Sequence, residues 1–167
     1  GFKNRIINGA MVIDQRNAGA SVTPTDGQYL LDRWNYGATQ ASKVSIQQNA
    51  GSLTPPVGFS NYLGVTSLSA YSVGSGDLFR LSTLIEGLNV ADLAWGTASA
   101  KTVTLSFLVY SSLTGTFGGS IVNNANNRSY PFTYTASSAN TWTTATVTIP
   151  GDTSGIWLTT NGIGLRV

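Results

Sequence analysis

The residues of this sequence that could do chemistry are few, and they suit binding better than catalysis. The chain of 167 residues contains no histidine and no cysteine, so it lacks the Ser-His-Asp and Cys-His nucleophile systems and any imidazole or thiolate metal site. Glycoside hydrolysis needs only two carboxylates at a defined separation. Glu86 is the one glutamate, and Asp92 is the aspartate nearest to it in sequence. No pattern places this pair in one cleft, so we expect no catalytic residue and no enzyme activity.

Aromatic and amide side chains are better candidates for a functional role. A sugar site commonly sets an aromatic ring against the apolar face of a pyranose and uses Asn, Gln, Asp or Arg for the hydroxyl groups. Several aromatic residues here are flanked by Gly, Ser, Thr or Asn, so ligand stacking and core packing both fit them. The segment 123–128 joins an arginine to several asparagines, which fit either a ligand site or the turn of a hairpin. The candidate glycan-binding residues are Tyr62, Trp95, Asn123, Asn124, Arg128 and Tyr130.

The sequence predicts no cofactor and no metal-ligating residues. A structural calcium would take oxygen ligands, to which Asp14, Asp26 or Asp152 could contribute. No dense acidic loop favours such a site.

The distribution of charged and apolar residues argues against two classes of partner, nucleic acids and membranes. The formal net charge is +2, but the nine Lys and Arg residues are spread along the whole chain, whereas a surface that follows phosphates clusters its cations. We therefore expect no nucleic-acid partner. No apolar stretch approaches the length that spans a bilayer, so no membrane insertion is expected.

The elements that would position the candidate residues are β-strands. Apolar residues make up 41% of the chain and charged residues only 10%, with 19 glycines, a composition typical of a turn-rich β-protein. Apolar and polar residues alternate clearly over 101–112 and 141–150. Two further strands are expected on either side of the loop 123–127, with Pro131 at a sheet edge or a bulge. Other expected strands cover 29–36, 42–48, 62–69, 77–85 and the final GIGLRV, and one short helical turn lies within 86–92.

Many short strands without βαβ alternation predict an all-β fold, a two-sheet antiparallel β-sandwich that is jelly-roll-like. Residues 1–167 are expected to form one such module, part of a longer protein. At its start, Asn8-Gly9 stands between the apolar pairs Ile6-Ile7 and Met11-Val12. This pattern predicts a tight turn between strands, so residues 1–19 are expected to hold a junction and the first strand.

Four segments carry a resemblance to a known group of proteins. They are NRIINGAMVIDQRNAG (4–19), YLLDRWNYG (29–37), LIEGLNVADLAWGTASAKTVTLSFLVYSS (84–112) and NRSYPFTYTASSANTWTTATVTIPGDTSG (127–155). Together they resemble bacteriophage virion modules of tail-fibre, head-fibre or capsid-decoration type, which are similar to carbohydrate-binding jelly-roll domains. The resemblance implies a place on the virion surface, with other virion proteins and host cell-surface glycans as partners, and a homo-oligomer such as a trimer.

Three functions follow from these expectations. The first is a non-enzymatic fibre-type module that contributes to host adsorption through weak, multivalent glycan binding. The second is an architectural decoration or fibre-joining domain whose aromatic faces pack on neighbouring subunits. The third is a fragment of a polysaccharide depolymerase.

Overall fold

The computed structural model describes residues 3–51 and 53–167, and these divide into two compact units, 1–83 and 84–167. The described residues form nine strands and two short 3-10 helices, and every strand pairing is antiparallel. The predicted all-β, antiparallel class is therefore confirmed. The jelly-roll connectivity and the single module over 1–167 stay predictions. The boundary between the units falls inside strand β4 (Phe79–Glu86), so each unit is described by itself.

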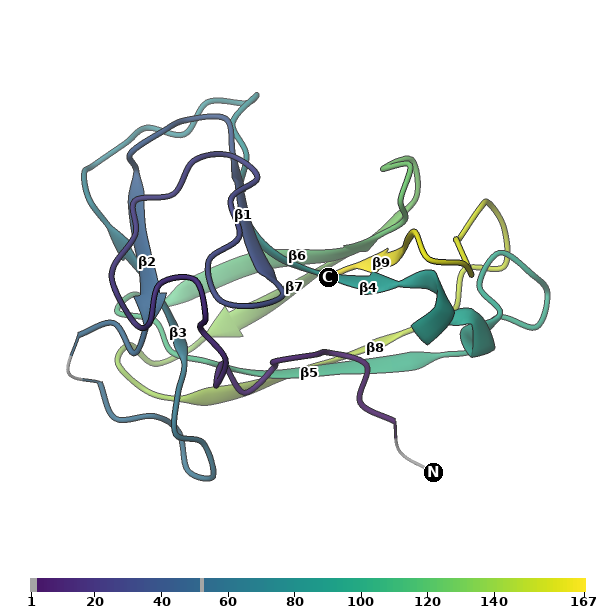
Figure 1. Cartoon of the computed structure of the whole chain (residues 1–167), viewed down its shortest axis with the longest axis horizontal. Helices are drawn as coiled ribbons and strands as arrows, with labels where there is room; N and C mark the ends of the chain where they lie inside the picture. Colours follow the sequence, from purple (N-terminus) through teal and green to yellow (C-terminus); the bar gives the residue numbers. More distant parts are fainter. Residues whose placement is uncertain (1–2, 52) are drawn as a thin grey trace. The chain divides into compact units, whose positions relative to one another are not determined.

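The N-terminal unit contains two antiparallel strand pairs. Strand β1 (Trp34–Ala38) pairs with the first part of β4, so that Trp34 lies opposite Thr83, and β2 (Val44–Gln48) pairs with β3 (Leu63–Ser67). Figure 1 shows these short strands among long connecting loops. The core of the unit consists of Leu30, Tyr36 and Ile46, with partly buried apolar residues packed against them.

The opening segment of this unit differs from the prediction. Residues 7–10 form the expected turn, with the Met11 amide donating to the Asn8 carbonyl at 3.1 Å. The strands predicted beside it are absent from residues 3–19, and residues 1–2 lie outside the described residues. The prediction of a first strand was wrong because both Asn8 and Met11 adopt a left-handed backbone, each with φ of 55°, which interrupts an extended chain.

The strand expected over 29–36 is a tight hairpin instead. Arg33 has a φ of 75°, and the Trp34 amide donates to the Leu31 carbonyl at 3.0 Å, which closes a turn inside the predicted strand. Beyond this turn the Leu30 amide donates to the Trp34 carbonyl at 2.9 Å. Strand β1 therefore begins only at Trp34.

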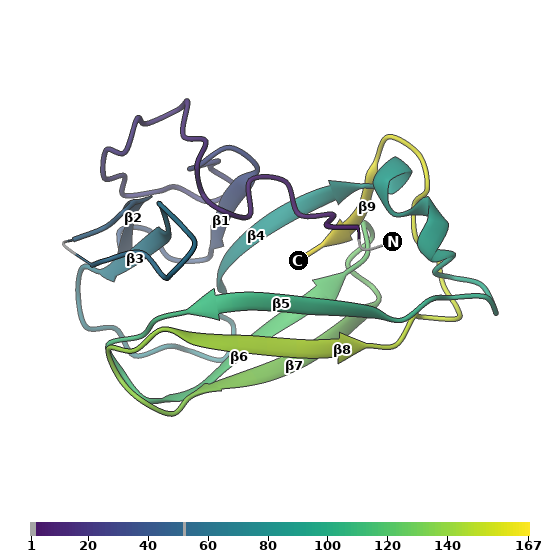
Figure 2. The same ribbon diagram turned by 90° about the horizontal axis from the view of Figure 1, so that it is seen from below.

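The C-terminal unit has two layers of strands. In one sheet the end of β4 pairs with β9 (Ile163–Arg166), which pairs with β6 (Gly115–Val122), and β6 pairs with β7 (Ser129–Ala136). The other sheet consists of β5 (Val103–Val109) and β8 (Thr143–Ile149). Figure 2 shows β5 and β8 in front of β6 and β7. This is the two-sheet arrangement that the sequence predicted.

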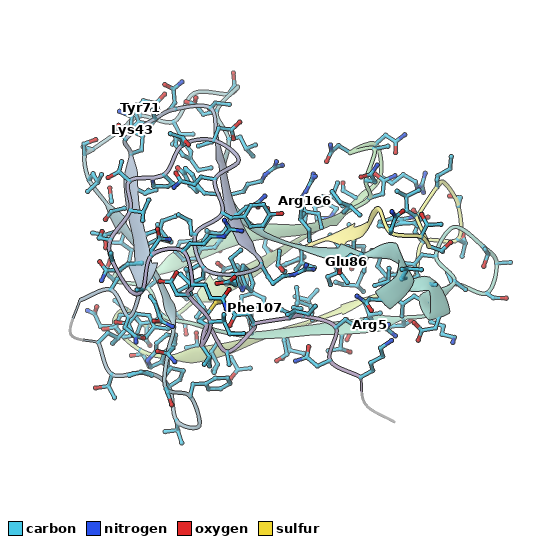
Figure 3. The ribbon with its side chains drawn as sticks, viewed as in Figure 1. Arg5, Lys43, Tyr71, Glu86, Phe107 and Arg166 are labelled. Carbon is cyan, nitrogen blue, oxygen red and sulfur yellow. The ribbon has the colours of Figure 1, made fainter. Side chains whose placement is uncertain are left out.

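Aromatic side chains fill the space between these two sheets. Phe107 of β5 is labelled in Figure 3. Its ring meets the Tyr134 ring of β7 edge-on, with centroids 5.0 Å apart, and its centroid lies 6.5 Å from that of the Phe132 ring. The outward positions of β5 and β8 carry exposed hydroxyl side chains such as Thr104, Ser106 and Thr146. The strand alternation read from the sequence thus separates an aromatic interior from a hydroxyl-rich surface.

Most other predicted elements of this unit are confirmed. The hairpin around 123–127 joins β6 to β7, and Pro131 lies in β7, an edge strand of its sheet. The helical turn predicted within 86–92 is two 3-10 helices, η1 (Gly87–Asn89) and η2 (Ala91–Leu93). The final strand is β9.

Candidate functional site

The loop between β6 and β7 is organised by one buried amide, that of Asn123. Its Oδ1 accepts the Asn127 and Arg128 amides at 3.1 and 3.2 Å, and its Nδ2 donates to Asn127 Oδ1 at 2.8 Å and to the Ile156 carbonyl at 3.0 Å. A carboxamide has two donor hydrogens and two acceptor positions, so Asn123 has no hydrogen-bonding capacity left. Its side chain fixes the hairpin loop and joins it to the segment before β9.

Arg128 and Asp152 form an ion pair beside this loop. The guanidinium Nε and Nη2 donate to the two carboxylate oxygens, with the Nη2 to Oδ1 distance at 2.8 Å. The hydrogen bond from Arg128 holds the pKa of Asp152 below its usual range, and the same bond raises the pKa of Arg128. Asp152 is therefore a carboxylate at neutral pH and cannot donate a proton as a general acid.

Trp157 also binds Asp152, and Trp95 packs against Trp157. The Trp157 indole Nε1 donates to Asp152 Oδ2 at 3.1 Å, and its ring meets the Trp95 ring edge-on with centroids 4.8 Å apart. The Trp95 Nε1 in turn donates to the Lys101 carbonyl at 2.8 Å. Because both indoles are buried, these contacts fix the position of the Asp152 carboxylate.

Gly155 allows Arg128 to lie close to the main chain. Its φ is +78°, and a Cβ built there would lie 1.9 Å from Arg128 Cδ. Any larger residue would displace the arginine stem, so both the backbone angle and the close approach require glycine.

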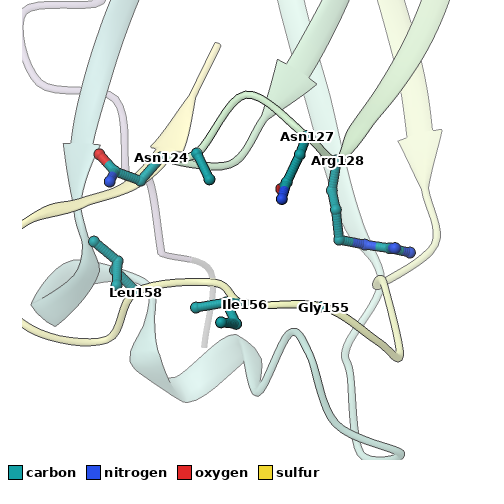
Figure 4. Close-up of a pocket in the computed structure, with 7 residues that line it drawn as sticks. Asn124, Asn127, Arg128, Gly155, Ile156 and Leu158 are labelled. Carbon is teal, nitrogen blue, oxygen red and sulfur yellow. The ribbon is translucent and has the colours of Figure 1, made fainter.

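A groove of about 380 Å³ lies between the hairpin loop and the segment before β9. In Figure 4, Asn124 and Asn127 stand on the loop side, and Ile156 and Leu158 on the opposite side. Ile156 is 76% exposed although it is a large apolar residue. The lining residues are Asn124, Ala125, Asn127, Arg128, Gly155, Ile156 and Leu158.

The groove combines apolar side chains with hydrogen-bond donors. A guanidinium carries five N–H donors, and the pair with Asp152 uses two of those on Arg128. The Asn127 side chain, which lines the groove, accepts from Asn123 through its oxygen and has two amide hydrogens as further donors. This set suits an uncharged polyhydroxylated ligand, because Asp152 already neutralises Arg128.

The structure brings some of the predicted site residues together. Asn124 and Arg128 line the groove, and Asn123 lies beneath it with every hydrogen-bonding position filled. Tyr130 is a half-buried residue of β7 and does not line the groove. It belongs to the same alternating set as Phe132 and Tyr134, which pack between the sheets.

Trp95 and Tyr62 are buried rather than presented to a ligand. Trp95 is 6% exposed and packs on Trp157 as described above. Tyr62 lies in the N-terminal unit, is 7% exposed, and donates from its hydroxyl to the Ala50 carbonyl at 2.6 Å. A ring in this situation has no open face for a pyranose, so neither residue belongs to the groove.

Sequence reasoning missed the part of the groove that comes from 155–158. Gly155, Ile156 and Leu158 lie between the polar runs 152–154 and 159–161, but they face the loop 123–128 only through contacts between distant parts of the sequence. Asp152, which the sequence offered as a possible calcium ligand, instead accepts the Ser154 amide at 3.1 Å and pairs with Arg128. Its pairing with Arg128 joins residues 24 positions apart, and no local pattern encodes such a contact.

The other carboxylates of the described residues have structural partners. Asp14 accepts the Asn17 and Gly19 amides at 3.1 and 2.7 Å, and Asp26 accepts the Ala38 amide at 2.9 Å. Glu86 Oε2 accepts from the Asn89 side chain at 3.2 Å, while Asp92 lies exposed in η2. Within 3–51 and 53–167 no three Asp or Glu side chains gather into a metal-binding group. No helix in these ranges is both long and apolar enough for a membrane span.

No protein-family model, no curated protein and no solved structure matches this chain. The resemblance to virion modules therefore stays a prediction from the four sequence segments.

Proposed function

We propose that this chain is a non-enzymatic module of a bacteriophage virion surface that contributes to host adsorption by weak, multivalent glycan binding. The observation that carries the binding part is the groove between the loop 123–128 and residues 155–158. The virion location rests on the resemblance of the four sequence segments alone.

The groove supports a sugar ligand through its mixture of surfaces. The exposed Ile156 side chain offers apolar contact for the C–H face of a pyranose, and Asn124 and Arg128 offer hydrogen bonds to hydroxyl groups. The ion pair with Asp152 fixes the arginine before a ligand arrives, which lowers the entropy cost of binding. A site with so few contacts binds weakly, and many copies on one particle raise the avidity.

The test uses the purified chain displayed in many copies on beads and a panel of purified bacterial surface polysaccharides. We expect Asn124→Ala and Ile156→Ser each to weaken retention of a bound polysaccharide by roughly 5-fold, the effect of losing about 1 kcal/mol. Both residues are exposed, so the thermal unfolding midpoint should not change. Thr146→Ala, on the outer face of β8, is the matched control and should bind as the unmodified chain does.

Two results would contradict the proposal. One is a correctly folded chain that retains no polysaccharide of the panel, and the other is equal retention by the groove variants and the control. Arg128→Ala is unsuitable alone, because it also leaves the partly buried Asp152 carboxylate without its cation. Release of reducing ends from a polysaccharide would indicate hydrolysis instead of binding.

A second candidate function is an architectural role in joining virion subunits. It is favoured by fourteen exposed large apolar residues among those described, of which ten lie in the N-terminal unit. They include Val57 and Val73, at 102% and 67% exposure. Exposed apolar surface of this kind is common at protein interfaces. Sedimentation over a range of concentrations checks this role: a defined oligomer such as a trimer supports it, and a monomer at every concentration contradicts it.

A further inference from the structure

Two Asn-Gly steps occur in this chain, Asn8-Gly9 and Asn161-Gly162. In such a step the main-chain nitrogen of glycine can attack the side-chain carbonyl carbon of asparagine. A five-membered imide forms, and ammonia leaves with the proton that the nitrogen loses. Water then opens the ring, so the net change is asparagine plus water to aspartate or isoaspartate plus ammonia. Glycine favours the reaction because it has no Cβ to hinder the attack.

The Asn8 side chain is held away from this reaction. Its Oδ1 accepts the Ile13 amide at 2.9 Å, and its Nδ2 donates to the Ile13 and Asp32 carbonyls at 2.8 Å each. To reach the Gly9 nitrogen, the carboxamide would have to rotate out of all three hydrogen bonds. The Asn8 amide therefore reacts only when this part of the chain opens.

The Asn161 side chain has no such constraint. It is exposed, and its carboxamide has no hydrogen-bond partner in the described part of the chain. The main chain on each side is nevertheless placed, because the Thr160 and Gly162 carbonyls accept the Leu88 and Gly87 amides at 2.9 and 2.8 Å. We propose that Asn161 is a spontaneous deamidation site of the folded protein and that Asn8, with the same following residue, is protected.

The modification has a structural consequence at the start of β9. Deamidation places a carboxylate at position 161 and lowers the formal net charge of +2 by one. The isoaspartate product also adds one carbon to the main chain between the Thr160 and Gly162 carbonyls. Both carbonyls then have to shift relative to the Gly87 and Leu88 amides, so exchange of these two amide hydrogens should become faster.

The experiment follows both steps in the same sample of the full chain at mildly alkaline pH. Peptide mapping by mass spectrometry measures the conversion of each amide to acid, and the enzyme that methylates isoaspartate detects the rearranged product. We expect Asn161 to react roughly 100-fold faster than Asn8, the factor given by three hydrogen bonds of ordinary strength. In concentrated urea the two rates should become similar, because the local sequences both contain Asn-Gly.

Gly162→Ala separates the chemistry from the fold. A Cβ there would meet only the end of the Leu158 side chain, at 2.7 Å from Cδ1, and Gly162 does not have a positive φ, so this variant should fold. It should slow the reaction at Asn161 and leave Asn8 unchanged. Equal rates at the two sites in the folded protein, or an Asn161 that reacts in urea but not in the folded chain, would overturn the proposal.

Discussion

The two units of this chain fix their main chains by different means. In the C-terminal unit, long strand ladders dominate: β6 and β7 share eight residue pairs, and β5 and β8 share seven. In the N-terminal unit, polar side chains hold loops directly. Asn8 and Asp14 bind main-chain groups of the opening segment, and Asn49 accepts the Tyr62 amide at 3.1 Å. The comparison shows that one chain can place its residues either by repeated pairing or by single, specific side-chain bonds.

The two means have different sensitivities to substitution. A ladder spreads its stability over many main-chain bonds and the apolar contacts beneath them, so the costly change is a cavity in the core. A side chain that binds several main-chain groups concentrates stability in one residue, so the costly change is loss of that residue. Substitutions chosen from each unit can therefore test the distinction.

The largest effect is expected for Ile149→Ala in β8. Ile149 is 0% exposed, and truncating it leaves a cavity between the sheets that costs roughly 2–5 kcal/mol in the free energy of unfolding. Thr148→Ala, at the exposed neighbouring position, should change that free energy by less than about 0.5 kcal/mol. Urea denaturation of both variants measures the difference. Similar free energies would show that the sheets of the C-terminal unit do not depend on this core.

A smaller loss is expected for Asn123→Ala, because this side chain of the C-terminal unit bonds several main-chain groups. The substitution leaves the Arg128 amide and the Ile156 carbonyl without their partner, at a cost of roughly 2–3 kcal/mol. Asn124→Ala on the same loop is the control, because Asn124 is exposed. Thermal and urea unfolding compare the two. If both variants are equally stable, the hairpin loop holds its form without the buried amide.

Asn8 provides the corresponding test in the N-terminal unit. Asn8→Ala removes three hydrogen bonds and places alanine at a φ of 55°, and we expect a loss of about 2–3 kcal/mol. Asn8→Gly removes the same bonds but tolerates the backbone angle. The difference between the two variants in urea unfolding isolates the strain. Equal losses would show that the hydrogen bonds account for the whole effect.

The same contrast explains what the sequence predicted and what it did not. Alternation in 101–112 and 141–150 predicted β5 and β8 because a ladder repeats every two residues, and the hairpin around 123–127 followed from its asparagines. The prediction of an opening strand was wrong because Asn8 and Met11 adopt a left-handed backbone, in a segment that the Asn8 side chain ties to the Asp32 carbonyl, 24 residues away. Of the residues that line the groove, the sequence predicted only Asn124 and Arg128, which belong to the loop 123–128. This loop is polar and local, whereas Ile156 and Asp152 reach Asn123 and Arg128 through contacts that no spacing rule encodes.

The smallest effect is expected from pH, at Asp77 in the N-terminal unit. Its carboxylate accepts the Gly74 amide at 2.8 Å, the Tyr71 hydroxyl at 2.7 Å and the Gln40 side chain at 3.0 Å. The Gly74 amide is the largest of the causes that lower the Asp77 pKa from 3.8 to about 2, and the Tyr71 hydroxyl is the next. In Figure 3, Tyr71 also lies beside Lys43, whose Nζ is 4.4 Å from the ring centroid.

The sign of the effect follows from the direction of this shift. Because the folded state lowers the Asp77 pKa, the carboxylate stabilises the fold above pH 3.8, and this stabilisation is lost as the pH falls towards about 2. Asp77→Asn should lower the unfolding midpoint at pH 6 and lose its difference from the unmodified chain near pH 2. Asp152 titrates in the same direction, but it is present in both proteins and cancels from the difference. Since Asp77 is only half-buried, we expect the effect to be small. A constant difference between the two proteins from pH 6 to pH 2 would show that the loop 71–77 is held by groups other than this carboxylate.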